Sequence, residues 1–185
     1  ITKNAPLDVD KLFEDSLNLM SMGNGSFSIF DMLHSMREND DETFAHCLNV
    51  GLFCNIFAGW LHLNEEQTKI ATLCGLLHDI GKTSVSEDIL SKEASLSKEE
   101  YKVIKTHAHE GFNFLKDLDI DSHIKNAALM HHERCDGSGY PFALTAAKID
   151  PYAKMVAIAD VYDAMTSSRS FRKAHSPFIA ISTIE

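Results

Sequence analysis

The chain has 185 residues, of which 44% are hydrophobic, and a formal net charge of −10 at pH 7. This length and hydrophobic content predict one globular unit with a single sizeable core and argue against a disordered chain. The sequence has no basic tract, which argues against binding to a long nucleic acid, whereas a small anionic ligand needs only a local cluster of cations or metal ions.

The four cysteines, Cys47, Cys54, Cys74 and Cys135, form no C-x-x-C pair. Most lie in apolar surroundings, which predicts reduced thiols in a cytoplasmic protein and a core position for the first three. The longest apolar stretch, from about Val50 to Leu63, is too short to span a membrane, so we expect no membrane contact by this piece. Because the sequence starts without methionine and ends in a helical pattern, we expect a fragment of a longer chain.

Apolar residues recur at helical spacing through most of the sequence, with almost no strict alternation, and this predicts an all-α fold. The first expected helices cover 8–20 and 27–37, so that residues 1–40 form an N-terminal helical segment that packs on the core or begins a linker. This segment is acidic, since residues 1–42 hold nine acidic and three basic side chains. A domain over 41–185 follows.

Within that domain, helices are expected over 41–61 and 65–79, the second ending at Gly81 as a C-terminal glycine. Ser97 and Glu100 form a capping-box pattern that opens a helix over 97–115. Another helix covers 121–132 and leads into the turn-rich segment DGSGYP. The last clear helix covers 151–167.

Several histidines and carboxylates fall at the ends or on the apolar faces of these expected helices. Buried carboxylates are costly unless they are paired or bound to metal, and imidazole with carboxylate suits iron, manganese, nickel or zinc. The absence of a cysteine cluster argues against a structural zinc site. The set therefore predicts a catalytic metal site, with these candidates: Glu42, His46, His78, Asp79, His107, His131, His132, and Asp160 or Asp163.

Each candidate also has a purely structural interpretation. Glu42 and His46 stand four apart and could form a solvated pair at a helix start. His107 could be a hydrogen-bonded histidine near the core, although it borders the apolar face whereas His109 points the opposite way. Asp163, three residues after Asp160, could cap the helix or pair with a neighbouring base. The number of such residues, and not any one of them, favours the metal site.

Three motifs together resemble one known family. HDIGK at 78–82, HHERCDGSGYP at 131–141 and IADVYDAMTSSR at 158–169 look like the HD-GYP subfamily of HD-domain phosphohydrolases, and the resemblance covers about residues 30–185. It implies a compact helical HD-type bundle with a metal site at its centre. It also implies a bacterial, cytoplasmic phosphodiesterase that hydrolyses cyclic di-GMP or 3',3'-cyclic GMP-AMP to a linear 5'-phosphorylated dinucleotide. Members normally continue through further helices beyond Glu185.

The same resemblance assigns roles to the candidates. The ligands of two divalent ions, iron or manganese first and nickel next, would be His46, His78, Asp79, His107, His131, His132 and Asp160. Glu42 is similar in position to an acid that in some members helps to hold a third ion. Asp79 would bridge two metals and, with Lys82, take part in catalysis. The substrate would be contacted by Lys82, Tyr140, Arg169 and Arg172. A sensor domain in the full-length chain and a second copy in a homodimer are further partners that the family admits.

The chain departs from the family pattern at three places: Cys47 replaces a serine, Ala108 replaces a proline, and Arg169-Ser170-Phe171-Arg172 replaces R-P-Y-R. All candidate ligands remain in place. Two competing interpretations stay open. One is a non-catalytic HD-GYP module that senses the dinucleotide or docks another protein, and the other is a mononucleotide phosphohydrolase of the wider HD group.

Overall fold

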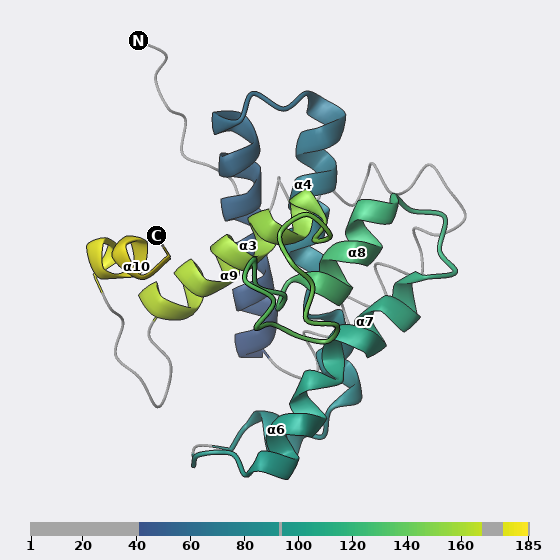
Figure 1. The fold of residues 1–185 in the computed structure, drawn as a ribbon, viewed down its shortest axis with the longest axis vertical. Helices are drawn as coiled ribbons and strands as arrows, with labels where there is room; N and C mark the ends of the chain where they lie inside the picture. The colour runs from purple at the N-terminus through teal and green to yellow at the C-terminus, as the bar shows by residue number, and fades with distance from the viewer. Residues whose placement is uncertain (1–40, 93, 168–175, 185) are drawn as a thin grey trace.

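The computed structural model describes residues 41–92, 94–167 and 176–184, so the helices expected over 8–20 and 27–37 lie outside the described residues. The described part consists of helices and loops, with one isolated β-bridge between Asp136 and Thr145 and no strand. The predicted all-α fold is thus confirmed, and Figure 1 shows its arrangement.

The helices from α3 to α8 follow one another with short connections, and a long loop over residues 131–150 joins α8 to α9. Their bounds are α3 Asp41–Trp60, α4 Glu65–Leu77, the 3-10 helix η1 Ile80–Ser84, α5 Glu87–Leu90, α6 Lys98–Lys105, α7 His107–Leu115, α8 Ser122–Met130, α9 Pro151–Thr166 and α10 Pro177–Ile184. Several starts are set by side-chain caps. Asn64 and Ser97 each form a complete capping box, and Asp121 and Asp150 each accept a hydrogen bond from a backbone N–H two residues on.

The single helix expected over 97–115 is wrong, because the structure divides it into α6 and α7 at Thr106. The Thr106 hydroxyl donates to the Val103 carbonyl at 2.7 Å, and the Thr106 N–H bonds the same carbonyl at 3.0 Å. Such local side-chain bonds compete with the regular helical ladder, and β-branched Val103, Ile104 and Thr106 lower helix propensity further. The division lets α7 enter the core while α6 projects away from the body of the domain (Figure 1).

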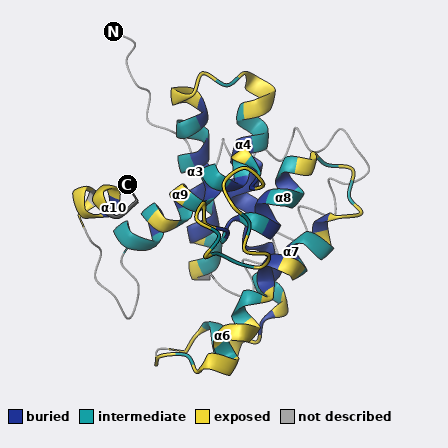
Figure 2. Cartoon of the chain, viewed as in Figure 1, coloured by how far each residue is buried: buried dark blue, intermediate teal, exposed yellow. Residues whose placement is uncertain are grey.

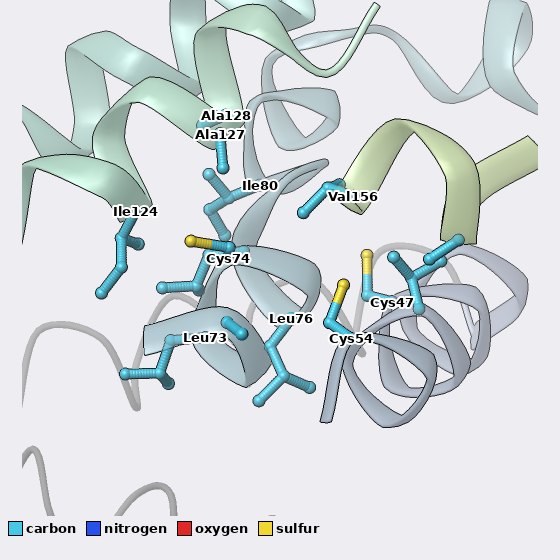
Figure 3. Packing of buried hydrophobic residues seen from close by; sticks show 14 of the residues in the cluster. Cys47, Cys54, Leu73, Cys74, Leu76, Ile80, Ile124, Ala127, Ala128 and Val156 are labelled. Atoms are coloured by element: carbon cyan, nitrogen blue, oxygen red, sulfur yellow. The ribbon is translucent and has the colours of Figure 1, made fainter. Parts of the chain in front are cut away.

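The core lies where α3, α4, α8 and α9 pack together. α3 and α4 approach so closely that a Cβ on Gly75 would lie 2.6 Å from the Cα of Gly51. Figure 3 shows part of the apolar cluster around this crossing. Its buried members are Cys47, Val50, Cys54, Ala58, Ala71, Leu73, Cys74, Leu76, Leu77, Ile80, Leu115, Ile124, Ala127, Ala128, Val156 and Ala159.

The cysteines are all free thiols, with Cys47, Cys54 and Cys74 buried and Cys135 exposed. Burial raises the pKa of Cys54 to about 12, so that thiol stays protonated in the core. Among the described residues, no helix combines the length and the apolar character that a membrane span requires.

Buried residues gather along the inner sides of the central helices, whereas α6 contributes none (Figure 2). Burial extends to polar side chains as well, a costly arrangement unless each is satisfied. The buried polar or charged residues are His46, Thr72, His78, Asp79, His107, His131, Glu133 and Asp163. Five of these eight are metal ligands that the resemblance implies, so the core and the candidate site are continuous.

Candidate metal centre

The C-terminal end of α4 carries the first two candidates. Residues 71–77 of this helix are all buried, and His78 forms its C-cap at 0% exposure. Asp79 follows at 2% exposure and connects α4 to η1. The apolar pattern that buries the end of α4 therefore also takes an imidazole and a carboxylate into the interior.

Three histidines are each oriented by a hydrogen bond from the ring Nδ1 to a backbone carbonyl. The rings of His78, His107 and His131 each bond a backbone carbonyl, at 2.7 Å to Gly75, 2.6 Å to Ile104 and 3.0 Å to Ala127, respectively. A carbonyl oxygen can only accept, so Nδ1 carries the proton and a neutral ring keeps its lone pair on Nε2. This tautomer is the one that ligates metal through Nε2.

His46 completes this pattern with a carboxylate. Its Nδ1 donates to Asp163 Oδ2 at 2.6 Å, and Asp163 also accepts from the Asn49 amide at 2.9 Å. A carboxylate behind a ligand histidine fixes the orientation of the ring and makes it more basic. One alternative for Asp163 was that it pairs with a neighbouring base. The structure shows such a pair, and the base is His46.

One group of candidate ligands consists of His46, His78 and Asp79. The Nε2 atoms of His46 and His78 lie 3.9 and 3.3 Å from Asp79 Oδ2. Asp160 on α9 adjoins this group, because its Oδ1 lies 3.0 Å from His46 Nε2. The first group therefore offers two imidazoles and two carboxylates from α3, α4 and α9.

A second group shares Asp79 and adds His107, His131 and His132. Here the other carboxylate oxygen, Oδ1, lies 3.3 Å from His107 Nε2 and 3.6 Å from His131 Nε2. Each oxygen of Asp79 thus faces a different group. This is the geometry that a carboxylate bridging two metal ions requires.

The nitrogen and oxygen atoms that face one another in these groups are arranged to bind a cation and not to hydrogen-bond with each other. His107 Nε2 and His131 Nε2 lie 3.2 Å apart, and both carry lone pairs in the tautomers set above. Within the described part of the chain, His78 Nε2 and Asp79 Oδ1 are buried without a hydrogen-bond partner. Buried acceptors that face each other unpaired are unfavourable, and a divalent ion among them would satisfy all of them.

The histidines of the two groups differ in the direction of their pKa shifts. Burial lowers the pKa of His107 to about 4 and that of His132 to about 2, so both rings are neutral at pH 7 and available as ligands. Burial also lowers the pKa of His46, but hydrogen bonds to Asp160 and Asp163 outweigh it and raise the pKa overall. The first group therefore attracts positive charge, which a metal ion can supply in place of a proton.

Lys82 and Tyr140 lie at the edge of these groups. The Lys82 ammonium bonds Asp79 Oδ2 at 2.5 Å, and its side chain keeps 22% exposure. The Tyr140 ring stacks on His132 with ring centroids 4.7 Å apart and 27° between the planes. Both side chains are thus within reach of a ligand bound at the metal groups.

The segment that carries Tyr140 is held by a buried carboxylate that sequence reasoning had not singled out. Glu133 is 5% exposed and accepts backbone hydrogen bonds from Phe142 at 2.6 Å and Leu144 at 2.8 Å. Its place directly after the histidine pair, within the motif HHERCDGSGYP, was the available signal. Glu133 therefore fixes the return of the loop that brings Tyr140 onto His132.

The remaining candidates are placed differently. Glu42 is exposed and belongs to neither group, and His109 is exposed on α7. Arg169 and Arg172 lie outside the described residues. Cys47 lies 4.0 Å from His78 Nδ1, but burial raises the pKa of this thiol, which disfavours the thiolate that metals bind.

The role expected for Gly81 as a helix-ending glycine is wrong. α4 ends at Leu77, and the only described glycine with a positive φ is Gly137. Gly81 instead provides space: a Cβ there would lie 2.0 Å from the His107 carbonyl oxygen and 2.4 Å from the Gly111 nitrogen. The missing side chain lets η1 touch α7, which brings Asp79 and His107 together.

We therefore expect Gly81→Ala to lower the free energy of unfolding by about 3 kcal/mol, because backbone atoms cannot yield to the new methyl group. Gly59→Ala is the matched control, since nothing lies within 4 Å of a Cβ at that exposed helical position. Because Gly59 lies in the last turn of α3, its substitution should change the free energy of unfolding by less than about 0.5 kcal/mol. Urea unfolding measures both, and equal midpoints for the two variants would contradict this role of Gly81.

Comparison with known proteins places this arrangement among related domains. Residues 33–185 match the family model described as HD domain. A cyclic di-GMP phosphodiesterase of Pseudomonas aeruginosa is 37% identical over 147 residues, covering 79% of this chain and 36% of the relative. A 3'3'-cGAMP-specific phosphodiesterase of Vibrio cholerae is 41% identical over 134 residues, covering 72% of this chain and 31% of the relative.

A solved structure shares the fold. It is an HDG"Y"P protein from Bdellovibrio bacteriovorus, with a TM-score of 0.66 and 21% identity, and the match covers 96% of this chain and 58% of that one. The chain spans about a third of the length of the curated relatives it matches, whose covered shares are 36% and 31%.

Proposed function

The chain belongs to the HD-domain family, in its HD-GYP branch, and on this premise we propose that it is a metal-dependent phosphodiesterase of bacterial second-messenger signalling. The proposed substrate is cyclic di-GMP or 3',3'-cyclic GMP-AMP, because these molecules appear in the names of the related phosphodiesterases. The proposed product is a linear 5'-phosphorylated dinucleotide. The bacterial cytoplasm is the proposed compartment.

The observation that carries the proposal is the double use of Asp79. Its two oxygens face two separate groups of imidazole and carboxylate donors, all buried or nearly so. We propose that the groups hold two divalent ions, iron or manganese in preference to nickel, with Asp79 as the shared ligand. Ions bound there would lower the pKa of a water molecule and neutralise phosphoryl oxygens, which are the two requirements of phosphodiester hydrolysis.

The protein's own side chains would position the substrate. Lys82 can turn from Asp79 toward a non-bridging phosphate oxygen, because its side chain is 22% exposed while the carboxylate is 2% exposed. A cation placed there stabilises charge that develops in the transition state. Tyr140 would line the pocket beside His132, and Arg169 and Arg172 are proposed as further phosphate contacts.

His46 and His132 are proposed as metal ligands whose rings are held in place by different neighbours. Asp163 holds His46 so that Nε2 points toward the first group, whereas His132 relies on stacking with Tyr140. Glu42 is kept as the proposed ligand of a third ion at the exposed start of α3. Its exposure predicts that such an ion would bind more weakly than the two at Asp79.

The experiment that tests this function uses protein loaded separately with iron(II) and manganese(II). Each form is incubated with cyclic di-GMP and with 3',3'-cyclic GMP-AMP, and the products are identified by chromatography. We expect the linear 5'-phosphorylated dinucleotide from at least one substrate. Tight binding of a cyclic dinucleotide without cleavage in either metal form would instead identify a sensing module.

A further inference from the structure

A lysine outside the metal groups is connected to them through aromatic rings. The Lys105 ammonium lies 4.7 Å from the ring centroid of Tyr140 and 4.7 Å from that of Tyr101. Tyr140 in turn stacks on His132, a member of the second group. A cation at the end of α6 is thus held beside the candidate active site, although α6 itself buries no side chain.

Within the described residues, no carboxylate forms an ion pair with Lys105. Among the ion pairs of the described residues, Lys82 pairs with Asp79 and Lys92 with Glu100, whereas Lys105 has no acidic partner. Contacts with aromatic faces position an ammonium group but leave its full positive charge in place. Lys105 therefore remains available to an anion that approaches Tyr140.

The proposed substrate supplies an anion for this position. A cyclic dinucleotide contains two phosphodiesters, and hydrolysis at the metal groups engages only one of them. The other remains charged and needs a cation at a distance from the metals. Tyr101 next to Lys105 is 49% exposed, so this edge of the site is open to a ligand.

We propose that Lys105 binds the phosphate of the cyclic dinucleotide that is not being cleaved, and that Tyr101 and Tyr140 hold the ammonium in place for it. This inference rests on the proposed function and assigns a specificity residue to the same site. It explains how the site would distinguish a cyclic dinucleotide from a phosphodiester with a single phosphate. Lys105 contacts Tyr140, which stacks on His132 of the second metal group.

The test compares two substrates that differ in the second phosphate. Lys105→Met keeps most of the side-chain length but removes the charge, and bis(4-nitrophenyl) phosphate offers one phosphodiester only. We expect kcat/KM for the cyclic dinucleotide to fall about tenfold relative to kcat/KM for bis(4-nitrophenyl) phosphate. The fall should come from a higher KM for the cyclic dinucleotide, with kcat little changed. Lys105→Arg should restore most of the ratio. Lys102→Met, on the exposed part of the same helix, is the matched control.

A purely structural role gives a different result. If Lys105 only held Tyr140 in place, Lys105→Met would change both substrates to the same extent, and the proposal would be overturned. An unchanged ratio with normal rates would overturn it as well.

Failure of the proposed function is separable from failure of this inference. Wild-type protein that cleaves neither cyclic dinucleotide would refute the hydrolase. Calorimetric binding of cyclic di-GMP to wild type and Lys105→Met would still decide the role of Lys105: about tenfold weaker binding by the variant supports the inference. Equal binding contradicts it.

Discussion

Asp79→Asn should abolish the cleavage of cyclic dinucleotides and remove metal from both groups at once. The carboxylate is 2% exposed, and its Oδ1 and Oδ2 face different sets of imidazoles. An amide offers one neutral oxygen and an N–H donor, so it cannot serve both groups. We expect the rate to fall by at least about 1,000-fold, which corresponds to about 4 kcal/mol of transition-state stabilisation.

Metal content is the second measurement on this variant. Burial raises the pKa of Asp79, but the charge of Lys82 is the largest of the effects that outweigh it and hold the pKa well below its usual range, so the native group is a carboxylate at pH 7. Asp88→Asn, at an exposed position of α5, is the matched control and should keep both metal and rate. An Asp79→Asn protein that retained its full metal content would show that this residue does not bridge the groups.

Lys82→Met should have the second largest effect and a different signature. Removing one cation that stabilises transition-state charge typically lowers kcat by about 100- to 1,000-fold. Burial lowers the pKa of Lys82, but the charge of Asp79 outweighs it and the pKa is raised, so the native side chain is an ammonium group at pH 7. Because the imidazoles and carboxylates remain, the variant should bind metal as the wild type does.

The control for Lys82→Met is Lys69→Met, which also removes an ion pair, here between Lys69 and Glu65 on the outer face of α4. Exposed pairs of this kind contribute little, so its rate should match the wild type. Steady-state kinetics with metal analysis on the same samples measures both variants. A Lys82→Met protein with normal kcat would remove Lys82 from the phosphate-binding role.

Local sequence signals were sufficient for the starts of four helices, α4, α6, α8 and α9. The capping boxes at Asn64 and Ser97 and the caps at Asp121 and Asp150 depend on contacts within three residues, and such contacts are visible in a linear pattern. The division at Thr106 was missed because the capping box predicts where a helix starts but says nothing about a hydroxyl that later competes for a carbonyl.

The candidate ligands could be named from their types and motifs, but their mutual geometry could not. His46 and Asp163 lie 117 residues apart in sequence, and only the packing of α3 on α9 brings them together. The same holds for Gly81, whose lack of a side chain matters only because α7 crosses it. Long-range contacts of this kind depend on the tertiary fold and have no local sequence signature.

The contacts of Lys105 illustrate the same limit. Tyr101 is one helical turn away and could have been paired with it from the sequence, whereas Tyr140 belongs to a distant loop. That loop reaches Lys105 because Glu133 holds its returning backbone. A role for Lys105 could therefore be inferred only with the structure.

The central claim, that two groups sharing Asp79 hold the metals that act on the substrate, is tested most directly by titrating metal-free protein with manganese(II). Cleavage of cyclic di-GMP or 3',3'-cyclic GMP-AMP is followed as bound metal is counted. The rate should rise with occupancy and reach its maximum when both groups that share Asp79 are filled. A metal-free protein that already cleaves at the full rate, or a rate complete when only one group is filled, would contradict it.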